Sequence, residues 1–134
     1  MAKNLKPDKS QPQKFSVRKR LASFRFAWNG IRYAFVQEHN FRIHIIAAFL
    51  VITGGIYCEL NRVEWVMLLF AIGFVFVTEL FNSAIELLAD FISPEENKII
   101  GKLKDISAAA VLIAVIVAVV TGIFVFWGHP GWNS

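Results

Sequence analysis

The sequence predicts an all-α membrane protein with three transmembrane helices and an N-terminal amphipathic helix at the membrane interface. Of its 134 residues, 56% are hydrophobic and 13 are Phe, and the mean hydropathy is +0.53. A soluble domain of this size is rarely so apolar. Three long apolar runs follow one another along the chain, and a segment rich in Arg and aromatic residues precedes them. The single cysteine, Cys58, excludes an intramolecular disulfide and a cysteine-based metal cage.

The first 37 residues divide into a polar tail and an amphipathic helix. Residues 1–14 hold Lys, Gln and Pro without an apolar period, which predicts a disordered cytoplasmic tail. Residues 15–134 are expected to form a single membrane domain. Within it, apolar residues recur every three or four positions over 16–37 and Arg residues fill another stripe, which is typical of a helix lying in the interface. The apolar positions are Val17, Leu21, Phe24, Trp28, Ile31 and Phe35.

Three transmembrane helices are predicted after this segment. The first, 43–58, has an uncharged stretch of only 14 residues from Ile45, so flanking residues must complete the span. The second, 65–89, requires that acidic residues be tolerated inside or at the edge of the hydrocarbon. The third, 106–128, has 23 residues without a charge, which is long enough to span.

The distribution of basic residues predicts the orientation. Ten of the 14 Lys and Arg residues precede His44, and the 90–105 connection holds three Lys. Basic residues mark the cytoplasmic side, so the N-terminus is expected inside and the C-terminus outside. Beside long apolar runs, this basic cluster favours anionic lipid headgroups over nucleic acid as its partner.

A stripe of small residues runs along the third predicted span, at Ala110, Ala114, Ala118 and Gly122. Small side chains four residues apart let two helix backbones approach closely in lipid. Three spans can hardly bury both this stripe and the polar stripe of the second span. A homo-oligomer is therefore expected.

The polar stripe of the second span holds Glu79, Asn82, Glu86 and Asp90. At 100° per residue, all four fall within roughly 80° of one helix face. Glu79 and Glu86 lie about 10 Å apart along the axis, which suits a substrate hydroxyl and a metal-bound phosphate. A carboxylate inside a span costs about 2.5–3.5 kcal/mol, so its default interpretation is functional.

Two other interpretations of these acids stay open. They could pair with Lys or Arg of a neighbouring helix, or Glu79 alone could carry protons or cations. The nearby SPEENKIIGKLKDIS segment adds Lys for phosphate oxygens and acids for Mg²⁺ or ribose, as phosphoryl transfer needs. Neither GxxxxGK[ST] nor GxGxxG occurs, so any ATP site differs from a P-loop or a protein kinase.

Three elements resemble a known family: AWNGIRYAFVQEHNFRIH (27–44), ELFNSAIELLAD (79–90) and KLKDISAAAVL (102–112). They are similar to the small prokaryotic diacylglycerol kinases and their undecaprenol kinase relatives. The resemblance implies a homotrimer in the bacterial cell (inner) membrane, with active sites between protomers at the cytoplasmic face. ATP would be the phosphoryl donor and Mg²⁺ the cofactor.

The resemblance also implies a role for each site residue. Glu79 would be the catalytic base, Glu38 and Glu86 the Mg²⁺ ligands, and Asn82 would orient the base or the lipid hydroxyl. The residues implied at the nucleotide are Lys19, Glu95, Glu96, Asn97, Lys104 and Asp105, of which Lys19 falls where part of the family has an Arg near the phosphates.

The acceptor lipid is expected from the same resemblance. His44 stands where the diacylglycerol branch typically has an acid, and NFRIH with Val63-Glu64-Trp65 is more similar to the undecaprenol branch. Phosphorylation of undecaprenol to undecaprenyl phosphate is therefore expected, with diacylglycerol to phosphatidic acid as the alternative. A proton-coupled transporter or a membrane-assembly subunit is the alternative from another functional class.

Overall fold

The protein is all-helical, and its computed structural model describes residues 17–93, 97–127 and 129, with side chains from Ala22 onward. The described residues form four helices: α1 (Val17–Gln37), α2 (His39–Tyr57), α3 (Arg62–Ile92) and α4 (Lys98–Trp127). The predicted tail, residues 1–14, lies outside the described residues. The predicted class, with one amphipathic helix before three long apolar helices, is confirmed.

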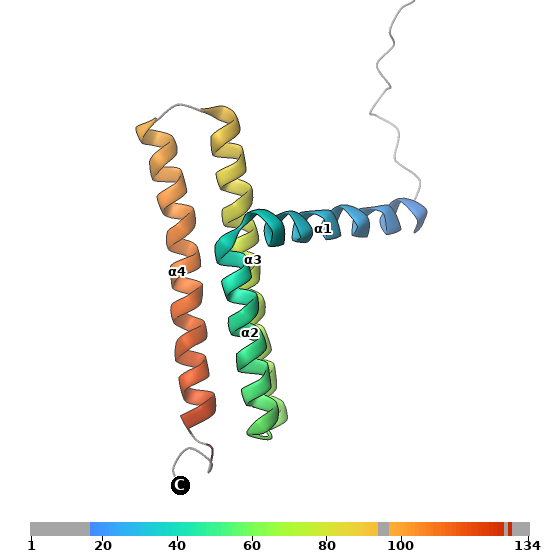
Figure 1. Ribbon diagram of the computed structural model, residues 1–134, viewed down its shortest axis with the longest axis vertical. Coiled ribbons are helices and arrows are strands. Elements are labelled where there is room, and N and C mark those ends of the chain that lie inside the picture. Colours follow the sequence, from blue (N-terminus) through green and yellow to red (C-terminus); the bar gives the residue numbers. More distant parts are fainter. Residues whose placement is uncertain (1–16, 94–96, 128, 130–134) are drawn as a thin grey trace, which may run out of the picture.

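Three of the helices form an elongated bundle. In Figure 1, α2, α3 and α4 lie lengthwise together, while α1 runs sideways from the start of α2. All three are long and apolar enough to cross a membrane. Each extends beyond the predicted span, α3 and α4 by several residues at the end near the α3–α4 connection. With 31 residues, α3 is about 46 Å long, whereas a bilayer's hydrocarbon core is about 30 Å. Part of α3 must therefore lie outside the hydrocarbon.

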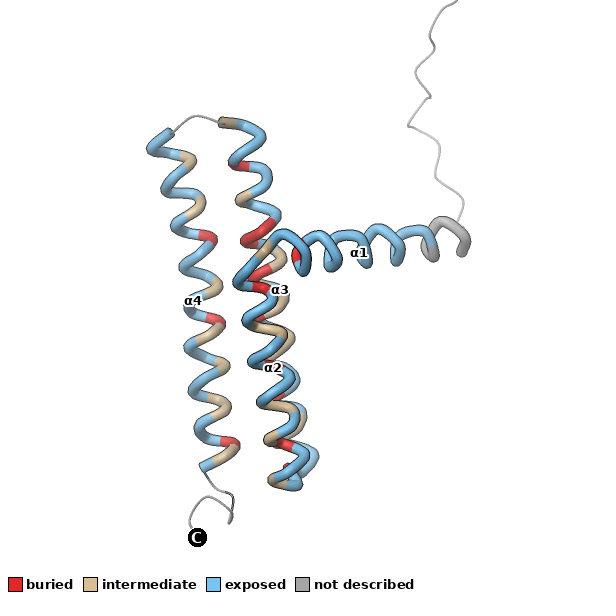
Figure 2. Tube along the Cα trace, in the orientation of Figure 1, coloured by how far each residue is buried: buried red, intermediate tan, exposed pale blue. Residues whose placement is uncertain are grey.

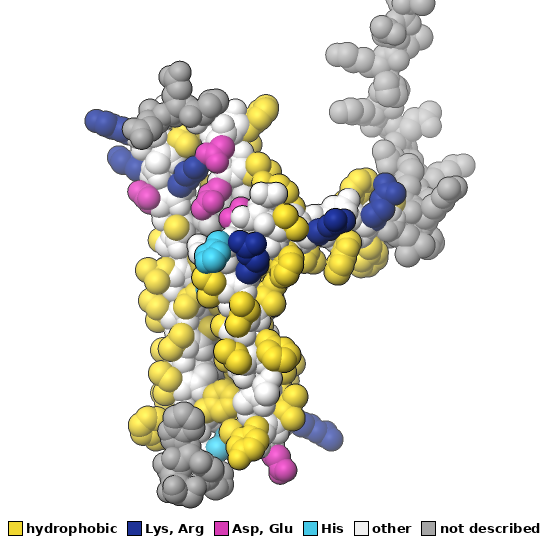
Figure 3. All heavy atoms as spheres, in the orientation of Figure 1, with side chains coloured by type: hydrophobic (Ala, Val, Ile, Leu, Met, Phe, Trp, Pro, Cys, Tyr) yellow, Lys and Arg dark blue, Asp and Glu magenta, His cyan; other side chains and the backbone are white. Residues whose placement is uncertain are grey.

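The charges show which part this is. Figure 3 shows Asp, Glu, Lys and Arg gathered at the end of the bundle where α3 meets α4 and along α1, above a long band of hydrophobic side chains. The bundle has a charged end, at α1 and the α3–α4 connection, and an opposite end, at the α2–α3 turn. An apolar band between two polar ends is what a membrane-spanning chain requires.

Helix α1 packs on the bundle through few residues. Ala34 is buried, whereas Phe24, Phe26 and Trp28 are more than 60% exposed. Figure 2 shows α1 exposed along almost all of the part whose burial is described, from Ala22 onward. Exposed aromatic side chains beside Arg residues suit a helix lying in the membrane interface.

The α2–α3 turn closes the opposite end through backbone geometry. Glu59 adopts a left-handed conformation (φ 52°), and the Leu60 N–H donates to the Gly55 carbonyl at 3.2 Å. These are features of a Schellman C-cap, in which glycine usually takes the left-handed position. Helix α3 then begins with a capping box, in which the Asn61 side chain accepts from the Glu64 N–H and the Glu64 carboxylate accepts from the Asn61 N–H.

The small-residue stripe contributes to packing within one chain. Helices α3 and α4 form the most extensive helix pair, and Ala114 in α4 is fully buried. Ala118 and Gly122 are half-buried, whereas Ala110 is exposed. The stripe thus brings α4 close to another helix, as predicted, and Ala114 does so inside the protomer.

Candidate active site

A group of polar side chains lies where the apolar band meets the charged end of the bundle. We call it the polar cluster; its members are His44, Glu79, Asn82, Ser83, Glu86, Asp90, Lys104 and Ser107. Three helices contribute to it, and α3 supplies five of the eight side chains. The predicted stripe on α3 is thus the centre of the cluster, with partners from α2 and α4.

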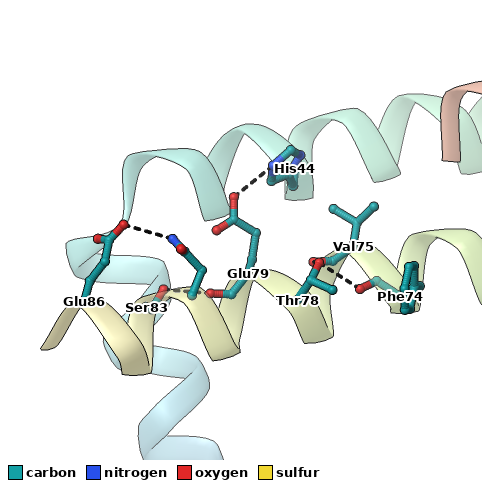
Figure 4. Close-up of polar contacts among 8 residues, drawn as sticks. His44, Phe74, Val75, Thr78, Glu79, Ser83 and Glu86 are labelled. Carbon is teal, nitrogen blue, oxygen red and sulfur yellow. Dashed lines mark hydrogen bonds and ion pairs between the residues drawn. The ribbon is translucent and has the colours of Figure 1, made fainter. Parts of the chain in front are cut away.

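Glu79 is the most enclosed carboxylate of the cluster. Its side chain is 3% exposed, and its Oε1 lies 3.0 Å from Nε2 of His44 in α2. Figure 4 shows the two side chains pointing toward one another across the space between α2 and α3. Near this contact, the rings of Phe41 in α2 and Phe76 in α3 pack with centroids 5.6 Å apart. An apolar contact therefore fixes the two helices beside the polar one.

Asn82 connects Glu86 to helix α4. Its amide nitrogen donates to Glu86 Oε1 at 3.0 Å, and its carbonyl oxygen lies 2.7 Å from the Ser107 hydroxyl, which can donate to it. Asn82 and Ser107 are both buried. The structure thus places Asn82 against Glu86 and α4, one turn away from the Glu79–His44 contact.

Asp90 and Lys104 form the outermost contact of the cluster. Lys104 Nζ lies 2.6 Å from Asp90 Oδ1, and the Asp90 side chain is 67% exposed. One of the three acids of the stripe therefore pairs with a cation of the neighbouring helix, the alternative left open by the sequence. Exposed pairs of this kind contribute little to stability and exchange readily with other anions.

Glu38 lies between α1 and α2 and is the N-cap of α2. Its backbone is extended (φ −94°, ψ 114°), and its side chain makes no capping hydrogen bond. It lies six residues before His44, the residue of α2 that contacts Glu79. Among the described residues, no group of three or more His, Cys, Asp or Glu side chains is arranged to hold a metal ion.

The remaining predicted nucleotide residues are only partly described. Asp105 and Asn97 are exposed at the charged end, close along the chain to Lys104. Glu95 and Glu96 lie outside the described residues, and so does the side chain of Lys19. The structure therefore brings together the α3 and α4 parts of the predicted site and does not test these three.

An apolar cavity of about 950 Å³ approaches the cluster from the membrane band. Helices α2, α3 and α4 line it, mainly with Ala, Val, Ile and Phe side chains, and His44 lies on its wall. The cavity thus brings an apolar surface to the residue that contacts Glu79.

Sequence analysis missed three members of the cluster: His44, Ser107 and Ser83, whose hydroxyl donates to the Glu79 backbone carbonyl within α3. In the sequence, His44 indicated only the acceptor lipid. A titratable side chain within an apolar run, however, usually pairs with another polar group. Ser107 was overlooked as one more small residue of KLKDISAAAVL, although it lies three positions after Lys104 and so near the same helix face.

The sequence is similar to those of known proteins. Residues 25–126 match the family described as prokaryotic diacylglycerol kinase. The chain is 36% identical over 106 residues to diacylglycerol kinase of Escherichia coli K12, covering 79% of this chain and 87% of that one. It is 38% identical over 103 residues to diacylglycerol kinase of Synechocystis sp., covering 76% and 59%. It is 34% identical over 104 residues to undecaprenol kinase of Bacillus subtilis, covering 78% and 85%.

Proposed function

This chain belongs to the prokaryotic diacylglycerol kinase family and is a membrane lipid kinase, and from that premise we propose that it transfers the γ-phosphate of ATP to the free hydroxyl of diacylglycerol. The observation that carries the proposal is the position of Glu79. This carboxylate is buried in the polar cluster, where the apolar band meets the charged end, and we place the lipid hydroxyl on its apolar side and the nucleotide on its charged side.

Glu79 is the proposed catalytic base. It accepts the proton of the lipid hydroxyl while that oxygen forms a bond to the γ-phosphorus of ATP. The bond between the γ-phosphorus and the bridging oxygen breaks, and ADP leaves with the electron pair. The products are the lipid phosphate monoester and ADP, and Glu79 then releases its proton to water.

Glu38 and Glu86 are the proposed Mg²⁺ ligands, and the chemistry of these donors fits the ion. Mg²⁺ prefers carboxylate oxygens. Glu86 lies two turns after Glu79 on α3. Glu38 lies at the start of α2, the helix that carries His44, the partner of Glu79. The Asn82 amide orients the Glu86 carboxylate through one oxygen, which leaves the other for the metal. When bound, Mg²⁺ would neutralise charge on the phosphates.

The charged end is the proposed nucleotide site. Lys104 would exchange its exposed partner Asp90 for a phosphate oxygen of ATP, since an ammonium group binds phosphate as a point charge. Asp105 and Asn97 would bind other parts of the nucleotide. We assign Glu95, Glu96 and Lys19 to the same site from the family resemblance alone.

The proposed acceptor differs from the one that the sequence motifs favoured. The family and two of the three relatives described above carry the name diacylglycerol kinase, which supports diacylglycerol over undecaprenol. Undecaprenol is the second candidate, because NFRIH with His44 resembles that branch and an undecaprenol kinase covers 78% of the chain. Alkyl chains alone discriminate poorly between acceptors.

We also propose a homotrimer with a cytoplasmic N-terminus. At least three quarters of the residues in each apolar helix window are not buried within the chain, so much of their surface is available to other protomers as well as to lipid. The basic residues of α1 and of the α3–α4 connection support a cytoplasmic charged end. Its nucleotide site would then face the compartment that contains ATP.

A phosphate-transfer assay tests the acceptor. The purified protein in mixed micelles receives Mg²⁺, [γ-³²P]ATP and equal amounts of diacylglycerol and undecaprenol. We expect labelled phosphatidate to form with the higher kcat/KM. Faster labelling of undecaprenol would overturn the acceptor, and labelling of neither lipid would overturn the proposal as a whole.

A further inference from the structure

Within the described part of the chain, the buried carboxylate of Glu79 has one close side-chain partner, His44. The Nε2–Oε1 distance of 3.0 Å lies within hydrogen-bonding range, and the imidazole itself is 20% exposed. Figure 4 shows that this contact crosses from α2 to α3. The bond between Asn82 and Glu86, by contrast, stays within α3. The orientation of the Glu79 carboxylate thus depends on a different helix.

A glutamate carboxylate needs such a partner to present one oxygen reproducibly. The last torsion of a glutamate side chain is broad, so packing alone leaves its two oxygens poorly oriented. A base must also lie within hydrogen-bond reach of the proton that it accepts, and errors of about 1 Å can cost on the order of 10²-fold in rate. An N–H held against Oε1 would turn Oε2 toward the acceptor.

His44 is well placed to hold the carboxylate in this way. It lies on α2 one turn after Phe41, whose ring packs against Phe76 of α3. It also lines the apolar cavity between α2, α3 and α4. The imidazole therefore stands between the cavity and the carboxylate, on a helix whose position is fixed by an aromatic contact.

We propose that His44 is a positioning residue for the acceptor step, whose Nε2–H holds Oε1 of Glu79 so that Oε2 receives the proton of the lipid hydroxyl. This inference rests on the proposed role of Glu79 as the base. It adds a role for a residue of α2 that touches neither ATP nor the metal.

Two amide substitutions of equal chemistry and different reach test this role. The amide nitrogen of Gln can occupy the place of Nε2, whereas the amide of Asn is one methylene short of it. His44→Gln should therefore keep a kcat close to wild type, while His44→Asn should lower kcat by about 10- to 100-fold. KM for Mg·ATP and the thermal unfolding midpoint should be alike in both variants. His129→Gln and His129→Asn, at the opposite end, are the matched controls and should both keep wild-type kcat.

The outcomes separate this inference from the proposed function. Equal kcat values for His44→Gln and His44→Asn, or kcat values that merely follow the unfolding midpoints, would overturn the positioning role. If Glu79→Gln is inactive while His44→Asn is fully active, only the role of His44 fails. If Glu79→Gln is fully active, the base assignment fails and the role of His44 fails with it.

Discussion

The two ends of the bundle each hold a histidine beside a glutamate, and the two pairs differ in what else the glutamate does. At the opposite end, His129 Nε2 lies 3.2 Å from Glu64 Oε2, and that same oxygen accepts the Asn61 N–H of the capping box at 2.8 Å. At the charged end, His44 lies 3.0 Å from Glu79, whose carboxylate caps no helix. The Glu64 side chain is 25% exposed and that of Glu79 is 3% exposed.

Structure alone explains only one of these two acids. Glu64 satisfies an N–H at the start of α3 and joins the end of α4 to the α2–α3 turn, so its role is complete without a ligand. Glu79 lies in the middle of a helix, at the cost of burying a carboxylate, and satisfies no backbone group among the described residues. We infer that its position serves the proposed proton transfer.

The largest expected difference between the two carboxylates is in how much each contributes to kcat. Glu79→Gln should lower kcat by about 10²–10⁴-fold, the usual contribution of a positioned general base, while ATP binding is retained. Glu64→Gln should leave kcat unchanged, because a glutamine can still cap the helix. Steady-state phosphate transfer to diacylglycerol measures both, and equal losses in the two variants would remove the distinction between the ends.

The next effect concerns the metal at the charged end. Glu86→Gln should raise the Mg²⁺ concentration needed for half-maximal activity, because it removes a negatively charged oxygen ligand. The expected rise is about 10- to 100-fold, the usual loss of metal affinity when a side chain that supports a metal site is removed. Glu38→Gln should act in the same direction, whereas Glu59→Gln, an exposed acid at the opposite end, should not. Mg²⁺ titrations that overlay wild type for both Glu38 and Glu86 variants would show that the metal is held elsewhere.

A third prediction concerns the seam between the two ends. Ala114 is fully buried in the α3–α4 contact, so Ala114→Leu should overpack it and destabilise the protein by about 1–3 kcal/mol. Because α4 also carries Ser107 and Lys104, activity should fall with stability. Thermal unfolding and transfer rate are measured together, with Val117→Leu, on the exposed side of α4, as the control. Wild-type stability and activity for Ala114→Leu would mean that the seam adapts without cost.

The smallest expected effect is a loss of stability from a substitution at the opposite end. Asn61→Ala removes the N-cap of α3 and should cost about 1 kcal/mol, seen as a lower unfolding midpoint in detergent. The transfer rate at low temperature should stay at the wild-type value, because the cap lies at the far end of α3 from the polar cluster. A rate that falls in proportion to stability would show that the two ends are coupled.

The sequence predicts these regions unequally. Helical periodicity and apolar length indicate the four helices. The spacing of Glu79, Asn82, Glu86 and Asp90, at offsets of 0, 3, 7 and 11, places them on one helix face. Contacts between helices cannot be obtained this way, because periodicity within a helix does not specify which residue faces it from a neighbour. The pairing of Glu79 with His44 and of Asn82 with Ser107 therefore appears only in the structure.

The helix ends show the same limit. The length of an apolar run predicts where a span leaves the hydrocarbon. The helix itself continues as long as its backbone N–H and C=O groups form intrahelical hydrogen bonds. Helix α4 thus begins at Lys98, eight residues before the predicted span, and carries Lys104 onto the helix opposite Asp90.

The acidity of the acceptor hydroxyl gives the most direct test of the claim that Glu79 receives the lipid's proton. Wild type and Glu79→Gln are compared on diacylglycerol and on an analogue whose free hydroxyl is made more acidic by neighbouring fluorine. A more acidic hydroxyl depends less on a base, so the ratio of wild-type to variant kcat should be clearly smaller for the fluorinated acceptor. The same ratio for both acceptors would contradict the account, because Glu79 would then act without taking the proton.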